Sequence, residues 1–249
     1  MIESGNGGPV AVRGQPPGPR RPLAFLDVLL ACAVASALIL IPFVGVLGFA
    51  ARRPGLDGEA AALATLGLLM LEPVAIFGGI YAVLIAWRRF AWADFGFRPA
   101  DIRWAAPAGL AALGCLAFAG AVTPLFDRYY DTSMLDEYLA LFAPGGFTWQ
   151  RAALLTLIVG GLVPLAEETL FRGVIYAWLR QRCGGALSAV ISAGLFALAH
   201  ANLRMALQIF VTGVVLAVLY ERSRSIFVST LAHMTVNTIS LVIIFSYAA

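Results

Sequence analysis

The sequence predicts an all-α protein, a polytopic transmembrane helical bundle of about seven spans, within a range of about six to eight. Of the 249 residues, 61% are hydrophobic and only 12% are charged, whereas soluble domains carry about 25% charged residues. Apolar runs of about 20 residues, long enough to cross a bilayer as a helix, alternate with short segments rich in arginine, glycine and proline. The expected surroundings are therefore a lipid bilayer. The net charge of +3 bears on membrane orientation, and we expect no nucleic-acid partner.

The chain opens on a segment that we do not expect to fold. Residues 1–21 are rich in glycine, proline and arginine and show no apolar periodicity, which is typical of a disordered tail. Residues 22–249 are predicted to form a single transmembrane helical-bundle domain.

Seven apolar stretches account for this bundle. The predicted spans are residues 23–51, 60–87, 104–126, 148–182, 186–200, 204–221 and 226–247. Between the third and fourth, the polar segment 127–142 is predicted to lie at the membrane interface, with a short helix at its end. The fourth span is about 50 Å long at 1.5 Å per residue, more than the hydrocarbon core of about 30 Å. It must tilt, kink at Pro164 or project from the bilayer.

The arginines give the predicted orientation. They are concentrated in the tail and in the segments that follow the second, fourth and sixth spans. Cytoplasmic segments carry the excess of basic residues in membrane proteins. We therefore expect the N-terminus in the cytoplasm and the C-terminus on the other side.

Residues 164–173 place three charges inside an otherwise apolar helix. Glu167, Glu168 and Arg172 are preceded and followed by nearly continuous apolar sequence. A charge at the bilayer centre costs about 2.5–3.5 kcal/mol, and such residues mark functional sites that face the protein interior. Glu168 and Arg172 have the i, i+4 spacing, acid first, that favours a helical ion pair. Glu167 points about 100° away and is left free for chemistry.

Further polar residues lie in the later helices. His200 and His233 are the only histidines, and Asn237 follows His233 by one helical turn. Taken alone, either histidine is more often a packing or hydrogen-bonding residue between helices. However, Glu167 lies 17 residues before the turn at Gly184 and His200 lies 16 after it, which is about 25 Å of helix in each direction. An antiparallel hairpin therefore places both at one depth, and tilt can bring His233 and Asn237 to them.

This constellation fits water-mediated peptide hydrolysis. Glu167 would take a proton from water, His200 would help to position that water, and His233 and Asn237 could donate hydrogen bonds to the oxyanion. The alternative is a zinc site, with Glu167, His200 and His233 as ligands and water as the fourth. The HExxH arrangement is absent. We favour no metal, and zinc stays the alternative.

Other buried polar residues are less informative. Glu72, deep in the second span, is expected to be half of a structural pair. Gln208 and Thr212, one turn apart, are candidates to line the same pocket. The three cysteines share no short spacing, which argues against a disulfide or a thiolate metal site.

Three motifs together resemble those of the CPBP family, the CAAX prenyl endopeptidases and bacteriocin-processing or immunity proteins, also called Abi. They are Glu167-Glu168-x-x-x-Arg172, Phe196-x-x-x-His200 and His233-x-x-x-Asn237. The resemblance covers about residues 150–240, the implied catalytic core. It implies that Glu167 is the catalytic base, His200 its partner and His233 with Asn237 the oxyanion site. Glu168, Arg172 and Phe196 are the implied supporting residues. Family members have been classed as metalloproteases, with metal-free, glutamate-activated water as the competing view.

The resemblance implies an intramembrane endopeptidase in a bacterial inner membrane, acting on a peptide or membrane-protein substrate. Cleavage of prenylated CAAX peptides is not expected to carry over. Two other classes stay open: a binding or immunity protein that keeps the fold without hydrolysis, and a small transporter that relays protons through its buried charges. A transporter more often shows repeated halves with broken helices. The sequence gives no indication of the oligomeric state.

Overall fold

The computed structural model describes residues 19, 21–51, 58–130 and 133–249, and in these ranges the regular structure is helical throughout. The predicted tail at residues 1–21 lies almost wholly outside them. The α-helices are α1 (Phe25–Ala51), α2 (Gly58–Ile80), α3 (Ala105–Tyr130), α4 (Met134–Phe142), α5 (Trp149–Leu157), α6 (Val163–Glu168), α7 (Ala177–Cys183), α8 (Gly185–Ala199), α9 (Ala206–Ser223) and α10 (Ile226–Ala248). Six helical stretches of the described chain are long and apolar enough to cross a membrane, and α8 is a shorter apolar helix. The protein is a polytopic helical bundle of about seven spans, as predicted.

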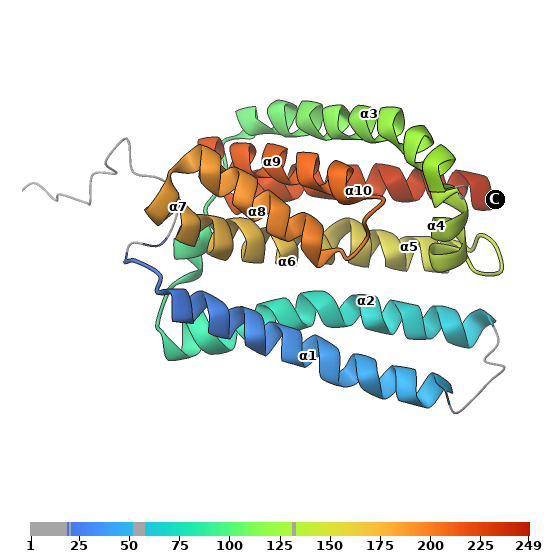
Figure 1. Ribbon diagram of the computed structural model, residues 1–249, viewed down its shortest axis with the longest axis horizontal. Helices are drawn as coiled ribbons and strands as arrows, with labels where there is room; N and C mark the ends of the chain where they lie inside the picture. Colours follow the sequence, from blue (N-terminus) through green and yellow to red (C-terminus); the bar gives the residue numbers. More distant parts are fainter. Residues whose placement is uncertain (1–18, 20, 52–57, 131–132) are drawn as a thin grey trace, which may run out of the picture.

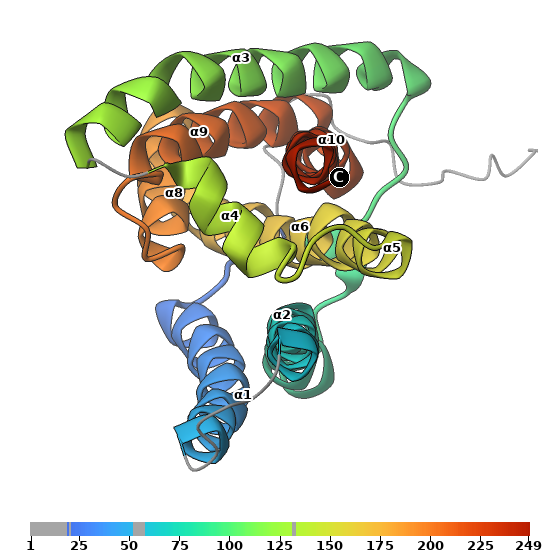
Figure 2. The ribbon, with the colours of Figure 1, turned by 90° about the vertical axis from the view of Figure 1, so that its right-hand side faces the viewer.

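The long helices run roughly along one axis (Figure 1). Viewed from the end of the bundle, the α1–α2 hairpin stands to one side, and α10 lies between α3, α6 and α9 (Figure 2). The two helices of the hairpin approach closely at Gly79, where an added Cβ would lie 2.7 Å from the carbonyl oxygen of Ala31. Glycine is therefore required there, because a methyl group would overlap the α1 backbone.

The long helix predicted at residues 148–182 is present from Trp149 to Cys183 but is not uniform. It passes through two π-helical segments, η4 (Ile158–Leu162) and η5 (Thr169–Tyr176), on either side of α6. The first ends just before Pro164, whose ring removes a backbone donor. Short π segments often occur at functional sites, and these two flank the Glu167–Glu168 pair.

The α8–α9 hairpin does not reach the far end of the bundle. α8 has 15 residues, about 22 Å of helix, which is shorter than the hydrocarbon core of about 30 Å. It is preceded by Gly184, whose φ of +77° suits glycine. α4 crosses the far end of the bundle (Figure 2), and the turn between α8 and α9 contacts α4 through Arg204 and Glu137. We refer to this end as the α4 end.

Candidate active site

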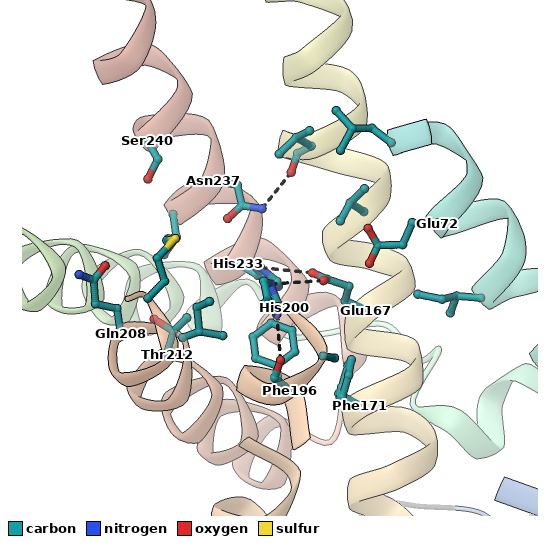
Figure 3. Close-up of a pocket in the computed structure, with 18 of the residues that line it drawn as sticks. Glu72, Glu167, Phe171, Phe196, His200, Gln208, Thr212, His233, Asn237 and Ser240 are labelled. Carbon is teal, nitrogen blue, oxygen red and sulfur yellow. Dashed lines mark hydrogen bonds and ion pairs between the residues drawn. The ribbon is translucent and has the colours of Figure 1, made fainter. Parts of the chain in front are cut away.

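A cavity of about 1000 Å³ opens between the helices, lined by residues of α1, α2, α3, α4, α6, α8, α9 and α10. Most of the lining side chains are aliphatic or aromatic. The polar lining residues include Glu72, Glu167, His200, Gln208, Thr212, His233, Asn237 and Ser240 (Figure 3). A mostly apolar cavity with a few convergent polar groups is the usual form of a binding or catalytic site.

Glu167 lies between the two imidazole rings. Its Oε1 is 3.7 Å from Nε2 of His200, and its Oε2 is 3.7 Å from Nε2 of His233 (Figure 3). The residue is 5% exposed. Three elements that are far apart in the sequence, α6, the end of α8 and α10, thus bring their polar side chains to one point.

Both rings are held through their other nitrogen. Nδ1 of His200 is 2.8 Å from the carbonyl oxygen of Phe196, and Nδ1 of His233 is 3.1 Å from Oε1 of Glu168. A carbonyl oxygen only accepts, so Nδ1 of His200 carries the proton. In the neutral ring its Nε2 is then an acceptor, and it faces Glu167.

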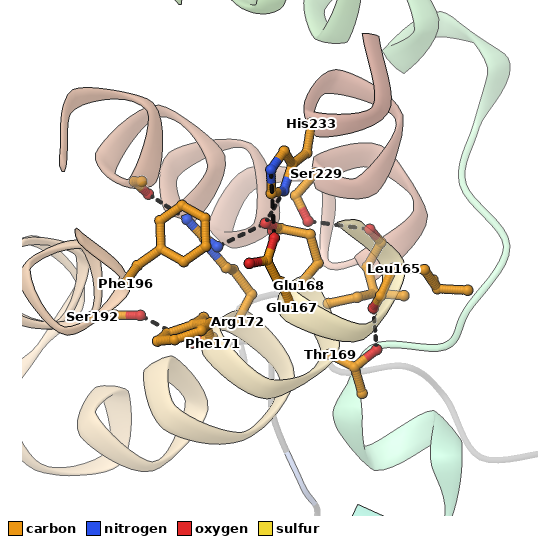
Figure 4. Close-up of polar contacts among 12 residues, drawn as sticks. Leu165, Glu167, Glu168, Thr169, Phe171, Arg172, Ser192, Phe196, Ser229 and His233 are labelled. Carbon is orange, nitrogen blue, oxygen red and sulfur yellow. Dashed lines mark hydrogen bonds and ion pairs between the residues drawn. The ribbon is translucent and has the colours of Figure 1, made fainter. Parts of the chain in front are cut away.

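Glu168 and Arg172 form the ion pair expected from their spacing. Arg172 Nη1 donates to Oε1 of Glu168 at 2.7 Å, and both side chains are fully buried. Nη2 of Arg172 donates to the carbonyl oxygen of Gly213 at 3.0 Å, which connects the pair to α9 (Figure 4). The contact of Glu168 with His233 was not predicted. It makes Glu168 the link between the buried arginine and the imidazole.

Phe196 packs against both imidazole rings, against a second phenylalanine and against the buried arginine. Its ring centroid lies 4.9 Å from that of Phe171, 4.7 Å from that of His200 and 5.7 Å from that of His233. The Arg172 guanidinium lies over its face at 4.6 Å, a cation–π contact. Phe196 therefore restricts the orientation of both imidazoles and of the arginine.

Asn237 lies on α10 one turn from His233 and also lines the cavity (Figure 3). Its Nδ2 donates to the carbonyl oxygen of Val159 at 2.9 Å. In a π-helical segment this carbonyl would accept from residue i+5, which is Pro164 and has no N–H. Asn237 supplies the missing donor, and its other N–H and its Oδ1 are left for further contacts.

Glu72 is a cavity residue that the sequence did not assign to the site. It lies on α2, lines the cavity and points toward Glu167 (Figure 3). The sequence predicted a structural pair, whereas in the structure the carboxyl group of Glu72 faces that of another acid, Glu167, inside the cavity (Figure 3). The sequence feature that could have assigned Glu72 to the site was its position as an acidic residue deep in a predicted span. Gln208 and Thr212 line the cavity as expected, and Gln208 donates to Thr123 at 3.0 Å.

The side chains of Glu167, His200 and His233 are of the types that bind zinc. In the described part of the chain, no three His, Cys, Asp or Glu side chains are arranged as a metal-binding group. Ligands of one tetrahedral zinc lie about 3.3 Å apart, and each imidazole Nε2 is 3.7 Å from the Glu167 carboxylate. Small side-chain movements would be needed to assemble such a site.

The fold and the site define an integral membrane protein with a buried carboxylate–imidazole centre. Residues 149–239, from α5 to α10, match the family described as type II CAAX prenyl endopeptidase Rce1-like. The chain is 33% identical over 156 residues to an uncharacterized 24.3 kDa protein of Escherichia coli, a match that covers 56% of this chain and 70% of that protein. The chain belongs to the Rce1-like family, within the CPBP group that its motifs resemble.

A second relative carries an activity in its name. The chain is 34% identical over 89 residues to the “Putative membrane peptidase YdiL” of Bacillus subtilis (strain 168). This match covers 35% of the chain and only 36% of YdiL. No solved structure matches the chain.

Proposed function

We propose that this protein is an intramembrane endopeptidase in which Glu167 activates the attacking water. The observation that carries the proposal is the position of the Glu167 carboxylate, 3.7 Å from Nε2 of each histidine inside a largely apolar cavity. Polar groups separated by more than about 3.5 Å are suited to a bridging water. A water held there touches a base and two ring nitrogens at once.

The reaction follows from these groups. Glu167 takes a proton from water as the water oxygen forms a bond to the peptide carbonyl carbon. The carbonyl π electrons move to oxygen, which becomes an oxyanion. When this intermediate collapses, the C–N bond breaks and the carboxyl group of Glu167 returns the proton to the leaving nitrogen. The products are a new carboxylic acid and a new amine, the acid proton then passes to the amine, and Glu167 is regenerated as a carboxylate.

The two histidines have different roles in this proposal. His200 accepts a hydrogen bond from the water at Nε2 because its Nδ1 proton is held by Phe196. His233 already donates from Nδ1 to Glu168. To donate from Nε2 to the oxyanion as well, its ring must carry both protons. The negative charge facing Nε2 is that of Glu167 before the proton transfer and that of the oxyanion afterwards, and Glu168 faces Nδ1 throughout. The free N–H of Asn237 is the second donor.

The family description and the name of the Bacillus relative support a peptidase. We propose a peptide or a membrane-protein segment as substrate, in a bacterial inner membrane with the N-terminus in the cytoplasm. We do not extend the proposal to prenylated CAAX peptides. If a zinc ion took part, Glu167, His200 and His233 would hold it, and it would polarise the water that they bind.

Hydrolysis and its metal dependence are tested in one experiment. The purified full-length protein in liposomes is incubated with a peptide library, and new termini are identified by mass spectrometry. We expect defined cleavage that is unchanged after exhaustive treatment with a zinc chelator, because water activation is assigned to the Glu167 carboxylate. Activity that is lost with the chelator and restored by stoichiometric zinc would replace the metal-free mechanism. The absence of any cleavage would contradict the proposed function.

A further inference from the structure

The α4 end of the cavity is closed by a helix that is neither a membrane span nor part of the region matched to the family, residues 149–239. Tyr138, Leu141 and Phe142 of α4 line the same cavity as Glu167. α4 packs against α10 and α2, and Phe142 belongs to an apolar cluster with Leu241 and other residues. Its inner face is therefore a wall of the cavity that holds the proposed catalytic groups.

A charged cluster holds α4 in this position. Arg204, in the α8–α9 turn, is 8% exposed. Its Nη2 donates to Oδ1 of Asp127 near the end of α3 at 2.8 Å, and its Nη1 pairs with Glu137 of α4. Oδ1 of Asp127 also accepts the backbone N–H of Met134, the first residue of α4, at 3.1 Å. One arginine thus connects the end of α3, the start of α4 and the α8–α9 turn.

Tyr138 is fixed within this wall. Its hydroxyl donates to the sulfur of Met205, and its ring stacks on that of Phe142 with centroids 5.7 Å apart and planes 8° from parallel. Burial raises the pKa of Tyr138 to about 12, so the phenol keeps its proton and donates at neutral pH. The hydroxyl and the ring face of Tyr138 are both held, and the side chain limits the space at the α4 end of the cavity.

We propose that α4 determines substrate specificity: Tyr138, Leu141 and Phe142 form an apolar subsite for one substrate side chain, and Tyr138 limits its size. Arg204 is the positioning residue that keeps this wall in place. The inference rests on the proposed endopeptidase function and adds to it the class of side chain that is recognised. An apolar lining favours an aliphatic or aromatic residue near the bond that is cut.

The first test compares peptides that differ at a single position near the cleavage site, carrying Ala, Leu, Phe or Trp. In Tyr138→Ala we expect the ratio of kcat/KM for the Trp peptide to that for the Ala peptide to rise about 10-fold or more, since pocket shape discriminates apolar groups by factors of this size. Tyr138→Phe keeps the ring and is the matched control, with the wild-type preference expected. An unchanged ratio in Tyr138→Ala at every position near the cleaved bond would overturn the assignment.

The second test does not depend on hydrolysis. Cys115 is a buried cavity residue on α3, and its reaction with a water-soluble maleimide can be timed in a Cys32→Ala, Cys183→Ala background. We expect Glu137→Gln and Arg204→Gln to speed this reaction about 10-fold by releasing α4, with folding checked by size-exclusion chromatography. Arg103→Gln is the control because Arg103 pairs with Asp101 in an exposed position.

The two tests fail differently. If the wild-type protein cuts no peptide, the proposed function is wrong, and the thiol measurement still decides whether α4 closes the cavity. If the folded Glu137→Gln variant labels Cys115 at the wild-type rate, the role of α4 and Arg204 is wrong even where the protein is an active peptidase.

Discussion

Glu167→Gln is expected to abolish peptide hydrolysis while the protein still inserts and folds. The amide has nearly the size and shape of the carboxyl group but cannot take a proton from water. General-base catalysis contributes about 10²–10⁴-fold to rates, so kcat should fall by about three orders of magnitude. The measurement is the rate of appearance of new peptide termini with purified protein in liposomes. His200→Ala should also abolish cleavage, because the water loses its second contact.

The control for this variant is Glu221→Gln, which removes a carboxylate of the same bundle outside the cavity lining. Glu221 accepts hydrogen bonds from Tyr176 at 2.6 Å and Arg180 at 3.0 Å, and it does not line the cavity. Its cleavage rate should stay close to that of the wild type. Wild-type activity in Glu167→Gln would remove Glu167 from the mechanism.

Arg172→Leu should cause the largest loss of stability. Glu168 and Arg172 are fully buried, and removal of one partner of a buried ion pair costs about 3–5 kcal/mol because the other charge is left uncompensated. The variant also removes the hydrogen bond from Arg172 to the carbonyl oxygen of Gly213. The free energy of unfolding is measured by titrating the detergent-solubilised protein with SDS. Arg103→Leu, which breaks an exposed pair, should change it by less than about 1 kcal/mol.

A double variant separates stability from catalysis. Replacement of a buried pair by apolar residues of similar size is often neutral or stabilising. Glu168→Leu combined with Arg172→Leu should therefore recover much of the stability lost in the single variant. It should remain inactive, because His233 no longer has Glu168 as its Nδ1 partner. Equal stability of the single and double variants would show that the Glu168 charge is compensated elsewhere.

Much of the fold could be predicted because hydropathy alone marks spans in a bilayer. Segments rich in arginine, glycine or proline end the apolar runs, and the helices begin and end within a few residues of those positions. The π-helical segments could not be predicted. The first of them is accompanied by the hydrogen bond from Asn237 to Val159, a contact between distant helices that no local pattern encodes.

Part of the candidate site could also be predicted from the sequence. The turn at Gly184 fixes how far Glu167 and His200 lie along two adjacent helices, so their common depth followed from counting residues. The position of Glu72 in the cavity could not be predicted, because nothing in the sequence indicates that α2 packs against α6. The short helix at the end of segment 127–142 was predicted and is α4, but its contact with Arg204 was missed. Arg204 reads as the end of a span, and its buried position depends on carboxylates that are 67 and 77 residues away.

The most direct test of glutamate-activated water is a single-turnover cleavage in H₂¹⁸O with enzyme in excess over peptide. If Glu167 acts as a base, the label enters the new carboxylate of the peptide product, and the Glu167 carboxyl group stays unlabelled. If Glu167 instead attacks the peptide to form an acyl intermediate, hydrolysis at the glutamate carbonyl would leave the label in Glu167. Label on Glu167 and an unlabelled peptide product would contradict the proposed mechanism.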